Sequence, residues 1–211
     1  YYNSLMSIEI KRSIKPVNYT DALKFLEDRA TKINKNESEE LIWILEHPPI
    51  FTAGTSFNEN DILDKSINIT KTSRGGKITW HGPGQLICYL AINLNNRKKD
   101  IRNFIKILEN SIIKTLTEYD IQSYNDRKNI GIWVNTNGRS EKVAAIGIKV
   151  KKWIAYHGFS LNIDNDLSNY KKIIPCGISD KGVTTLKKIK NRNYNRIAEK
   201  IIKNLYSNLE N

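Results

Sequence analysis

The sequence is poor in cysteine and lacks a long hydrophobic run. Its 211 residues include only two cysteines, Cys88 and Cys176, whereas secreted domains that depend on disulfides carry several. Neither cysteine belongs to a CxxC pair, so we expect no structural zinc and no other bound metal. The longest apolar run, residues 86–92, is far shorter than the roughly 20 residues of a membrane helix. We therefore expect a soluble protein of the cytoplasm or an organelle matrix, with no membrane partner.

Positive charge exceeds negative charge by a wide margin. The chain carries 34 Lys and Arg against 22 Asp and Glu, a formal net charge of +12. Two explanations stay open: a coding bias, and an acidic partner that is attracted electrostatically. Nucleic acid would be one such partner and an acidic protein another. No zinc finger, recognition helix or RNP-like aromatic motif accompanies the charge, so we expect no nucleic-acid partner.

Hydrophobic periodicity predicts strands and helices without a regular β–α–β repeat. The expected strands are residues 7–13, 40–47, 68–73, 85–94, 129–135, 142–150 and 153–163. The expected helices are residues 21–33, 101–119 and 195–209, with Thr20 and Asp100 as N-caps of the first two. Residues 50–57 are expected to form a loop, and 165–185 an irregular segment. The pattern predicts one α/β (α+β) domain over residues 1–211, a mixed β-sheet flanked by helices.

The stretch RGGKITWHGPGQL, residues 74–86, concentrates four glycines around Arg74 and His81. Glycine at this density lets the backbone approach a ligand closely, and loops that lead into core strands often carry sites. The alternative is a tight hairpin with a surface histidine. The stretch is neither a phosphate-binding GxxxxGK[ST] loop nor a dinucleotide-binding GxGxxG motif.

Two further strands contain residues that could take part in chemistry. His157 and Gly158 lie inside an alternating strand, where a glycine indicates a bulge or a close ligand approach. A lone histidine there is more often part of the core. Lys142 begins a strand with small side chains, among them Ala145 and Gly147, which would leave room beside it. The alternative for Lys142 is an ordinary lysine at a sheet edge.

Cys176 lies in the segment IIPCGI and has two interpretations that the residues alone leave open. A thiolate is a good nucleophile when a nearby cation or amide dipole lowers the thiol pKa. His81, His157 and the lysines are the available activators. The alternative is a buried, inert thiol. Cys88, inside an apolar strand, is expected to be a small buried hydrophobe, and His47 a residue at the end of a strand.

Five segments in one order carry a specific family resemblance: EHPPIFTAG, RGGKITWHGPGQL, KVAAIGIKV, YHGFSLNI and IPCGI, spanning residues 46–178. The chain resembles the lipoyl(octanoyl) transferases, which are octanoyl-[acyl carrier protein]:protein N-octanoyltransferases. The resemblance implies the catalytic fold of the biotin and lipoate protein ligases. Trp80 stands where tyrosine or phenylalanine is common in the family, and no motif residue is lost.

The resemblance implies transfer of an octanoyl group from acyl carrier protein to a lysine of a lipoyl domain, without a cofactor. Lipoyl domains of this kind belong to 2-oxoacid dehydrogenase E2 subunits and the glycine cleavage H protein. Cys176 matches the family's acyl-thioester nucleophile, and Lys142 matches the lysine that activates the cysteine and serves as acid and base. A monomer is expected.

The resemblance also implies which residues bind the substrate. Three segments match the walls of the acyl pocket, and His157 is a supporting candidate. The matching residues are Arg74, Gly75, Gly76, Lys77, Ile78, Thr79, Trp80 and His81, then Ala145, Ile146 and Gly147, and then Gly158, Phe159 and Ser160.

Three alternatives are weighed against this expectation. An ATP-dependent lipoate–protein ligase would need a nucleotide-phosphate loop, and no GRGR or RRxxGGG motif is found. A nucleic-acid-binding domain rests on charge alone. A zinc site built from His81, His157 and Cys176 is conceivable, and we expect none.

Overall fold

A computed structural model describes residues 7–175 and 181–210. Its main element is a mixed sheet with the strand order β1-β2-β6-β10-β9-β8-β7, in which β11 also pairs with β9. The pairs β1–β2 and β9–β11 are parallel and the others antiparallel. The strands are β1 (Ile8–Arg12), β2 (Glu40–Leu45), β6 (Gln85–Asn93), β7 (Tyr124–Asn125), β8 (Ile132–Thr136), β9 (Arg139–Lys151), β10 (Ile154–Asn162) and β11 (Gly182–Val183).

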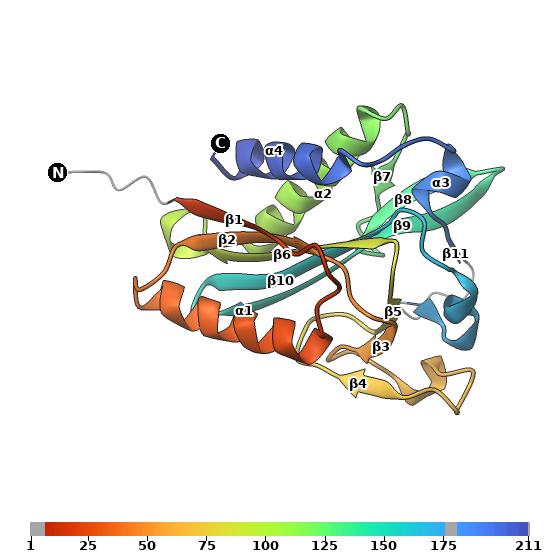
Figure 1. Ribbon diagram of the computed structural model, residues 1–211, viewed down its shortest axis with the longest axis horizontal. Coiled ribbons are helices and arrows are strands. Elements are labelled where there is room, and N and C mark those ends of the chain that lie inside the picture. The colour runs from red at the N-terminus through yellow and green to blue at the C-terminus, as the bar shows by residue number, and fades with distance from the viewer. Residues whose placement is uncertain (1–6, 176–180, 211) are drawn as a thin grey trace.

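Helices cover both faces of this sheet (Figure 1). Helix α1 (Tyr19–Asn34) packs on one face, where Leu26, Trp43 and Tyr156 belong to one buried cluster. Helices α2 (Ile101–Thr117) and α4 (Ile197–Glu210) pack side by side on the other face, over a second buried cluster. The short helix α3 is Leu186–Ile189. The predicted α/β (α+β) class with a mixed, helix-flanked sheet is confirmed.

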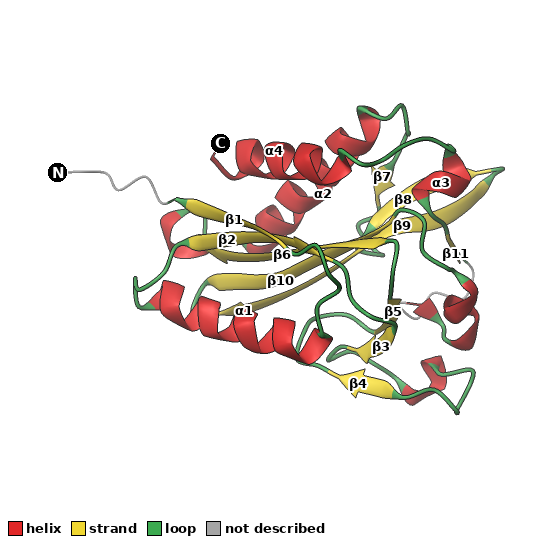
Figure 2. Ribbon diagram, viewed as in Figure 1, coloured by secondary structure: helices red, strands yellow, loops and turns green. Residues whose placement is uncertain are grey.

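A small second sheet lies beside the main one (Figure 2). Its order is β4-β3-β5, formed by β4 (Ile69–Lys71), β3 (Ile50–Ala53) and β5 (Ile78–His81). The prediction of a loop over residues 50–57 is therefore wrong for its first four residues. Antiparallel pairing of β3 with β5, a contact distant in sequence, gives this short segment its strand conformation. The connecting 3-10 turns are η1 (Glu59–Asp61), η2 (Leu94–Asn96) and η3 (Ser168–Lys172).

Side chains at the helix starts decide where the helices begin. The Asp100 side chain accepts a hydrogen bond from the Asn103 backbone N–H at 3.0 Å, so the predicted cap of α2 is confirmed. The prediction of Thr20 as the cap of α1 is wrong. Asn18 caps this helix and accepts from the N–H of Thr20 at 2.9 Å, which starts α1 at Tyr19.

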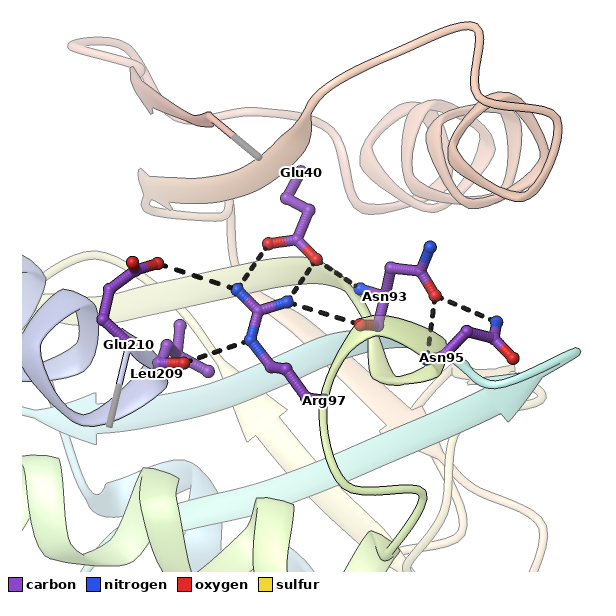
Figure 3. Close-up of polar contacts among 6 residues, drawn as sticks. All are labelled: Glu40, Asn93, Asn95, Arg97, Leu209 and Glu210. Atoms are coloured by element: carbon purple, nitrogen blue, oxygen red, sulfur yellow. Dashed lines mark hydrogen bonds and ion pairs between the residues drawn. The ribbon is translucent and has the colours of Figure 1, made fainter. Parts of the chain in front are cut away.

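A buried ion pair joins the end of the last helix to the sheet (Figure 3). The Arg97 guanidinium donates to both carboxylate oxygens of Glu40, at 2.5 and 2.8 Å, and the Glu40 side chain is fully buried. The Arg97 Nε donates at 3.1 Å to the Leu209 carbonyl in the last turn of α4, where a cation is favoured by the helix dipole.

In the described part of the chain, no helix is long and apolar enough to cross a membrane.

Candidate active site

A cavity lies on the α1 side of the main sheet, between β9, β10, β6 and the segment that contains β5. Its walls are Tyr19, Arg74, Gly76, Lys77, Ile78, Thr79, His81, Ile87, Tyr89, Ala145, Ile146, Gly147, His157, Gly158, Phe159 and Ser160. The three predicted segments, far apart in sequence, thus meet around one space. Among the predicted pocket residues, Gly75 and Trp80 do not line it.

Gly75 and Trp80 instead support the cavity wall. The Gly75 N–H donates to the Ile148 carbonyl at 3.3 Å and fixes the glycine-rich loop on β9. Gly147 allows this approach, because a Cβ there would lie 3.2 Å from the Gly75 carbonyl oxygen. The buried Trp80 indole packs edge-on against Tyr170, with ring centroids 6.0 Å apart.

Arg74 organises the loop around its own guanidinium. Its Nη atoms donate to the carbonyl oxygens of Gly75 at 3.0 Å, Thr52 at 3.0 Å and Lys77 at 2.9 Å. The Thr52 carbonyl belongs to β3, and those of Gly75 and Lys77 belong to the loop before β5, so one cation holds this loop against β3. Its Nε is buried without a hydrogen-bond partner among the described residues. Arg74 therefore places a positive charge at the cavity wall.

Gly158 is required by the packing of β10 against β6. A Cβ at this position would lie 1.9 Å from the Cys88 carbonyl oxygen. The close approach at this glycine is therefore made by main chain, although Gly158 also forms part of the cavity wall. Cys88 itself is fully buried, as predicted, and burial raises the pKa of its thiol.

His157 is turned toward the cavity by its backbone. Ala155 and Phe159 point to the α2 and α4 face, and strand alternation would send His157 there too. Its φ of +73° reverses this, and the ring stacks on Tyr156, with centroids 5.1 Å apart. Neither ring nitrogen has a hydrogen-bond partner among the described residues. Burial, aided by Arg74 and Lys149, lowers the pKa of His157 to about 3.

His81 is also buried, which excludes the alternative of a surface histidine. Its Nδ1 lies 2.7 Å from the Gln85 Oε1, and the Gln85 Nε2 donates to the Asn162 Oδ1 at 2.8 Å. This network assigns the His81 proton to Nδ1 and leaves Nε2 as the acceptor. Burial lowers the pKa of His81 to about 3.

Tyr19, Tyr89 and Ile87 are wall residues that the sequence analysis missed, and His47 supports one of them. His47 Nδ1 donates to the Val17 carbonyl at 2.7 Å, so Nε2 accepts from the Tyr89 hydroxyl at 2.8 Å. Burial lowers the pKa of His47 to about 4 and raises that of Tyr89. The alternation in residues 85–94 could have indicated Ile87 and Tyr89, which share a face.

A β-bulge places Lys142 on the cavity side of the sheet. Ile132 pairs with Ala144 but Trp133 pairs with Lys142, so Val143 is an extra residue in β9. Val143 and Ala144 both belong to the α2 and α4 core. Lys142 therefore shares a face with Ala145 despite their odd separation. It is buried in an internal strand, which excludes the edge-lysine alternative.

Cys176 lies outside the described residues, and the described chain is anchored on either side of it. Before it, the Ile174 N–H donates to the Asp61 carbonyl at 2.7 Å. After it, Val183 of β11 pairs with Lys142 of β9. Within residues 7–175 and 181–210, no group of three or more His, Cys, Asp and Glu side chains could hold a metal ion.

Comparisons with known proteins identify the family of the chain. The lipoyl protein ligase A/B catalytic domain matches residues 18–205. An octanoyltransferase of Wolbachia sp. subsp. Brugia malayi is 49% identical over 174 residues, covering 82% of this chain and 85% of the relative.

Solved structures share the fold. A bi-partite lipoate protein ligase from Thermoplasma acidophilum gives a TM-score of 0.75 at 12% identity, over 97% of this chain and 84% of that one. Biotin protein ligase from Aquifex aeolicus gives a TM-score of 0.57 at 15% identity, over 96% of this chain and 70% of that one. The expected ligase-type fold is therefore confirmed. The chain belongs to the lipoyl protein ligase A/B catalytic domain family, and curated relatives 40–49% identical to it are octanoyltransferases.

Proposed function

We propose that this acyltransferase moves an octanoyl group from acyl carrier protein to a lysine of a lipoyl domain, through a thioester on Cys176. The observation that carries the proposal is the cavity together with the position of Lys142. Lys142 lies on the same face of β9 as Ala145, a residue of the cavity wall. Its walls are largely apolar, and each buried methylene of an acyl chain contributes about 0.8 kcal/mol of binding free energy.

The wall residues of β9 and β10 extend over a distance that suits an acyl chain of medium length. On β10 its wall runs from Ser160 to His157, and on β9 from Ala145 toward Ile148, the residue opposite His157. Three residues of a strand span about 10 Å, which is close to an extended eight-carbon chain. Ser160 pairs with Ala145, at the end nearer Lys142. The reacting carbonyl would lie there, and the methyl end would lie at His157.

The proposed chemistry has two balanced steps. The Cys176 thiolate attacks the thioester carbonyl of the donor, and the phosphopantetheine thiolate leaves and takes up a proton. The neutral amine of the target lysine then attacks the new thioester, an amide bond forms, the amine gives up one proton to the catalytic base and the Cys176 thiolate leaves. Neither step needs ATP, because one thioester replaces another and amide formation from a thioester is downhill. No cofactor is required.

Lys142 is the proposed group for moving the protons because the β-bulge puts it on the cavity side of β9. A general base works best when its pKa lies near the working pH. With pKa values of about 3 for His81 and His157 and about 4 for His47, the histidines are poor bases at neutral pH. We assign acid and base catalysis to Lys142, and the histidines to the shape and polarity of the cavity.

The proposed partners are acyl carrier protein as donor and lipoyl domains of 2-oxoacid dehydrogenase E2 subunits and the glycine cleavage H protein as acceptors. The net charge of +12 favours encounter with an acidic carrier. We propose a cytoplasmic monomer.

A transfer assay tests the proposal. Octanoyl–acyl carrier protein and an unmodified lipoyl domain are mixed with the protein in the absence of ATP, and the acceptor mass is followed. The expected result is one octanoyl group on the acceptor lysine. Modification that requires free octanoate and ATP, with release of pyrophosphate, would instead identify a ligase.

A further inference from the structure

The segment of residues 126–133, which leads into β8, encloses the side chain of Lys142. The Lys142 Nζ donates to the Ile130 carbonyl at 3.1 Å and lies 4.7 Å from the centre of the Trp133 ring. Lys142 forms no ion pair with any described carboxylate. Its ammonium is thus held by one carbonyl and one aromatic face.

Gly131 provides the space for the lysine stem. A Cβ at this position would lie 3.1 Å from the Lys142 Cε and 2.7 Å from the Ala144 carbonyl oxygen. Its φ of +137° is also one that glycine adopts readily and other residues rarely do. Any side chain here would displace the four-carbon stem from its course toward Ile130.

A hydrogen-bonded chain fixes Trp133 in turn. The indole Nε1 donates to the Asn129 carbonyl at 2.9 Å, and the Asn129 Nδ2 donates to the Asp126 Oδ2 at 2.8 Å. Lys181 donates to the same Asp126 oxygen at 2.9 Å. Asp126 therefore ties the segment around Lys142 to the chain that follows Cys176.

We propose that Trp133 and Gly131 are positioning residues, which hold the Lys142 ammonium at one place on the cavity side of β9. Lysine has a flexible stem with several rotatable bonds, and a misplaced catalytic group costs rate even when its chemistry is unchanged. The centre of the Trp133 ring lies 4.7 Å from the Lys142 ammonium and 4.6 Å from the Lys181 ammonium. The gap at Gly131 sets the direction of the Lys142 stem. The catalytic consequence rests on the proposed role of Lys142.

Two substitutions of Trp133 separate the aromatic face from the packing. Trp133→Leu keeps an apolar side chain without a ring face, and Trp133→Phe keeps a ring. We expect Trp133→Leu to lower kcat about 2- to 30-fold, the range of a cation–π contact, with KM for both substrates unchanged. Trp133→Phe should restore most of the rate. In a Lys142→Ala background, Trp133→Leu should cause no further loss.

A chemical readout tests the positioning without reference to activity. The rate at which acetic anhydride labels Lys142, measured by peptide mass spectrometry, should rise several-fold in Trp133→Leu and in Gly131→Ala. Gly138→Ala is the matched control, because Gly138 also has a positive φ, of +80°, but no atom lies within 4 Å of its Cβ position. Its labelling rate at Lys142 should equal that of the wild type.

The outcomes are distinct. Unchanged labelling of Lys142 in folded Trp133→Leu, or an equal loss of kcat with and without Lys142, would overturn the inference. If the wild type transfers no octanoyl group while labelling responds as expected, the proposed function fails and the positioning stands.

Discussion

The imidazole of His157 stacks on the ring of Tyr156, its neighbour in the chain, at an interplanar angle of 19°. Consecutive residues of a strand normally point to opposite faces, and the positive φ of His157 is what brings the two rings together. Backbone strain of this kind costs of order 1–3 kcal/mol and is found mostly at functional sites. In this protein the positive φ places the imidazole of His157 at the end of the cavity that lies away from Lys142.

His157→Gly should therefore lengthen the cavity without unfolding the protein, because glycine adopts this φ without strain. We expect transfer of decanoyl relative to octanoyl groups to rise several-fold in a competition between the two acylated carriers. His157→Ala should show the same preference but be less stable than His157→Gly by about 1 kcal/mol, the cost of a left-handed φ with a side chain. An unchanged chain-length preference in both variants would place the chain end elsewhere.

Gly158→Ala should be strongly destabilising. The added Cβ would meet the Cys88 carbonyl oxygen at 1.9 Å, and this oxygen belongs to the central strand β6, which cannot move freely. Overpacking of a core costs about 1–3 kcal/mol and sometimes more. Urea unfolding gives the free energy of unfolding. A loss below about 0.5 kcal/mol would show that β6 and β10 can separate locally.

Arg97→Met should destabilise the protein by about 3–5 kcal/mol, because it leaves the Glu40 carboxylate buried without its partner. The matched control is Lys32→Met, which breaks the exposed Lys32–Asp28 pair of α1. That change should cost less than about 1 kcal/mol. Both values come from denaturant unfolding at neutral pH, and equal effects would contradict the importance of burial at Glu40.

Acid should destabilise the fold through its three histidines. Their pKa values in the folded state, about 3 to 4, lie below the ordinary 6.5. Between pH 6.5 and pH 4 the unfolded chain binds protons that the folded protein does not, so stability falls as pH falls. Each such histidine contributes up to about 1.4 kcal/mol per pH unit. Denaturant unfolding at several pH values gives the free energy of unfolding against pH, and this dependence should be shallower for His157→Gly than for the wild type. Identical slopes would mean that His157 titrates normally.

The sequence predicted the parts of this molecule that depend on local pattern. Continuous apolar runs located β2 and β6, alternation located β10, and the glycine-rich stretch indicated the loop that closes the cavity. Pairing between distant segments decided what the sequence could not show. The pairing of β3 with β5, the bulge at Val143 and the positive φ of His157 each depend on neighbours far along the chain. Tyr19 was missed because it reaches the cavity from α1 through tertiary packing.

The mass of the intact protein after mixing with octanoyl–acyl carrier protein, without ATP or acceptor, tests the central claim most directly. We predict one octanoyl adduct on the wild type that hydroxylamine removes, and none on Cys176→Ala. Hydroxylamine cleaves a thioester but leaves an amide, so the result identifies the bond. An adduct that persists in Cys176→Ala, or no adduct on folded wild type that still transfers octanoyl groups, would contradict a thioester on Cys176.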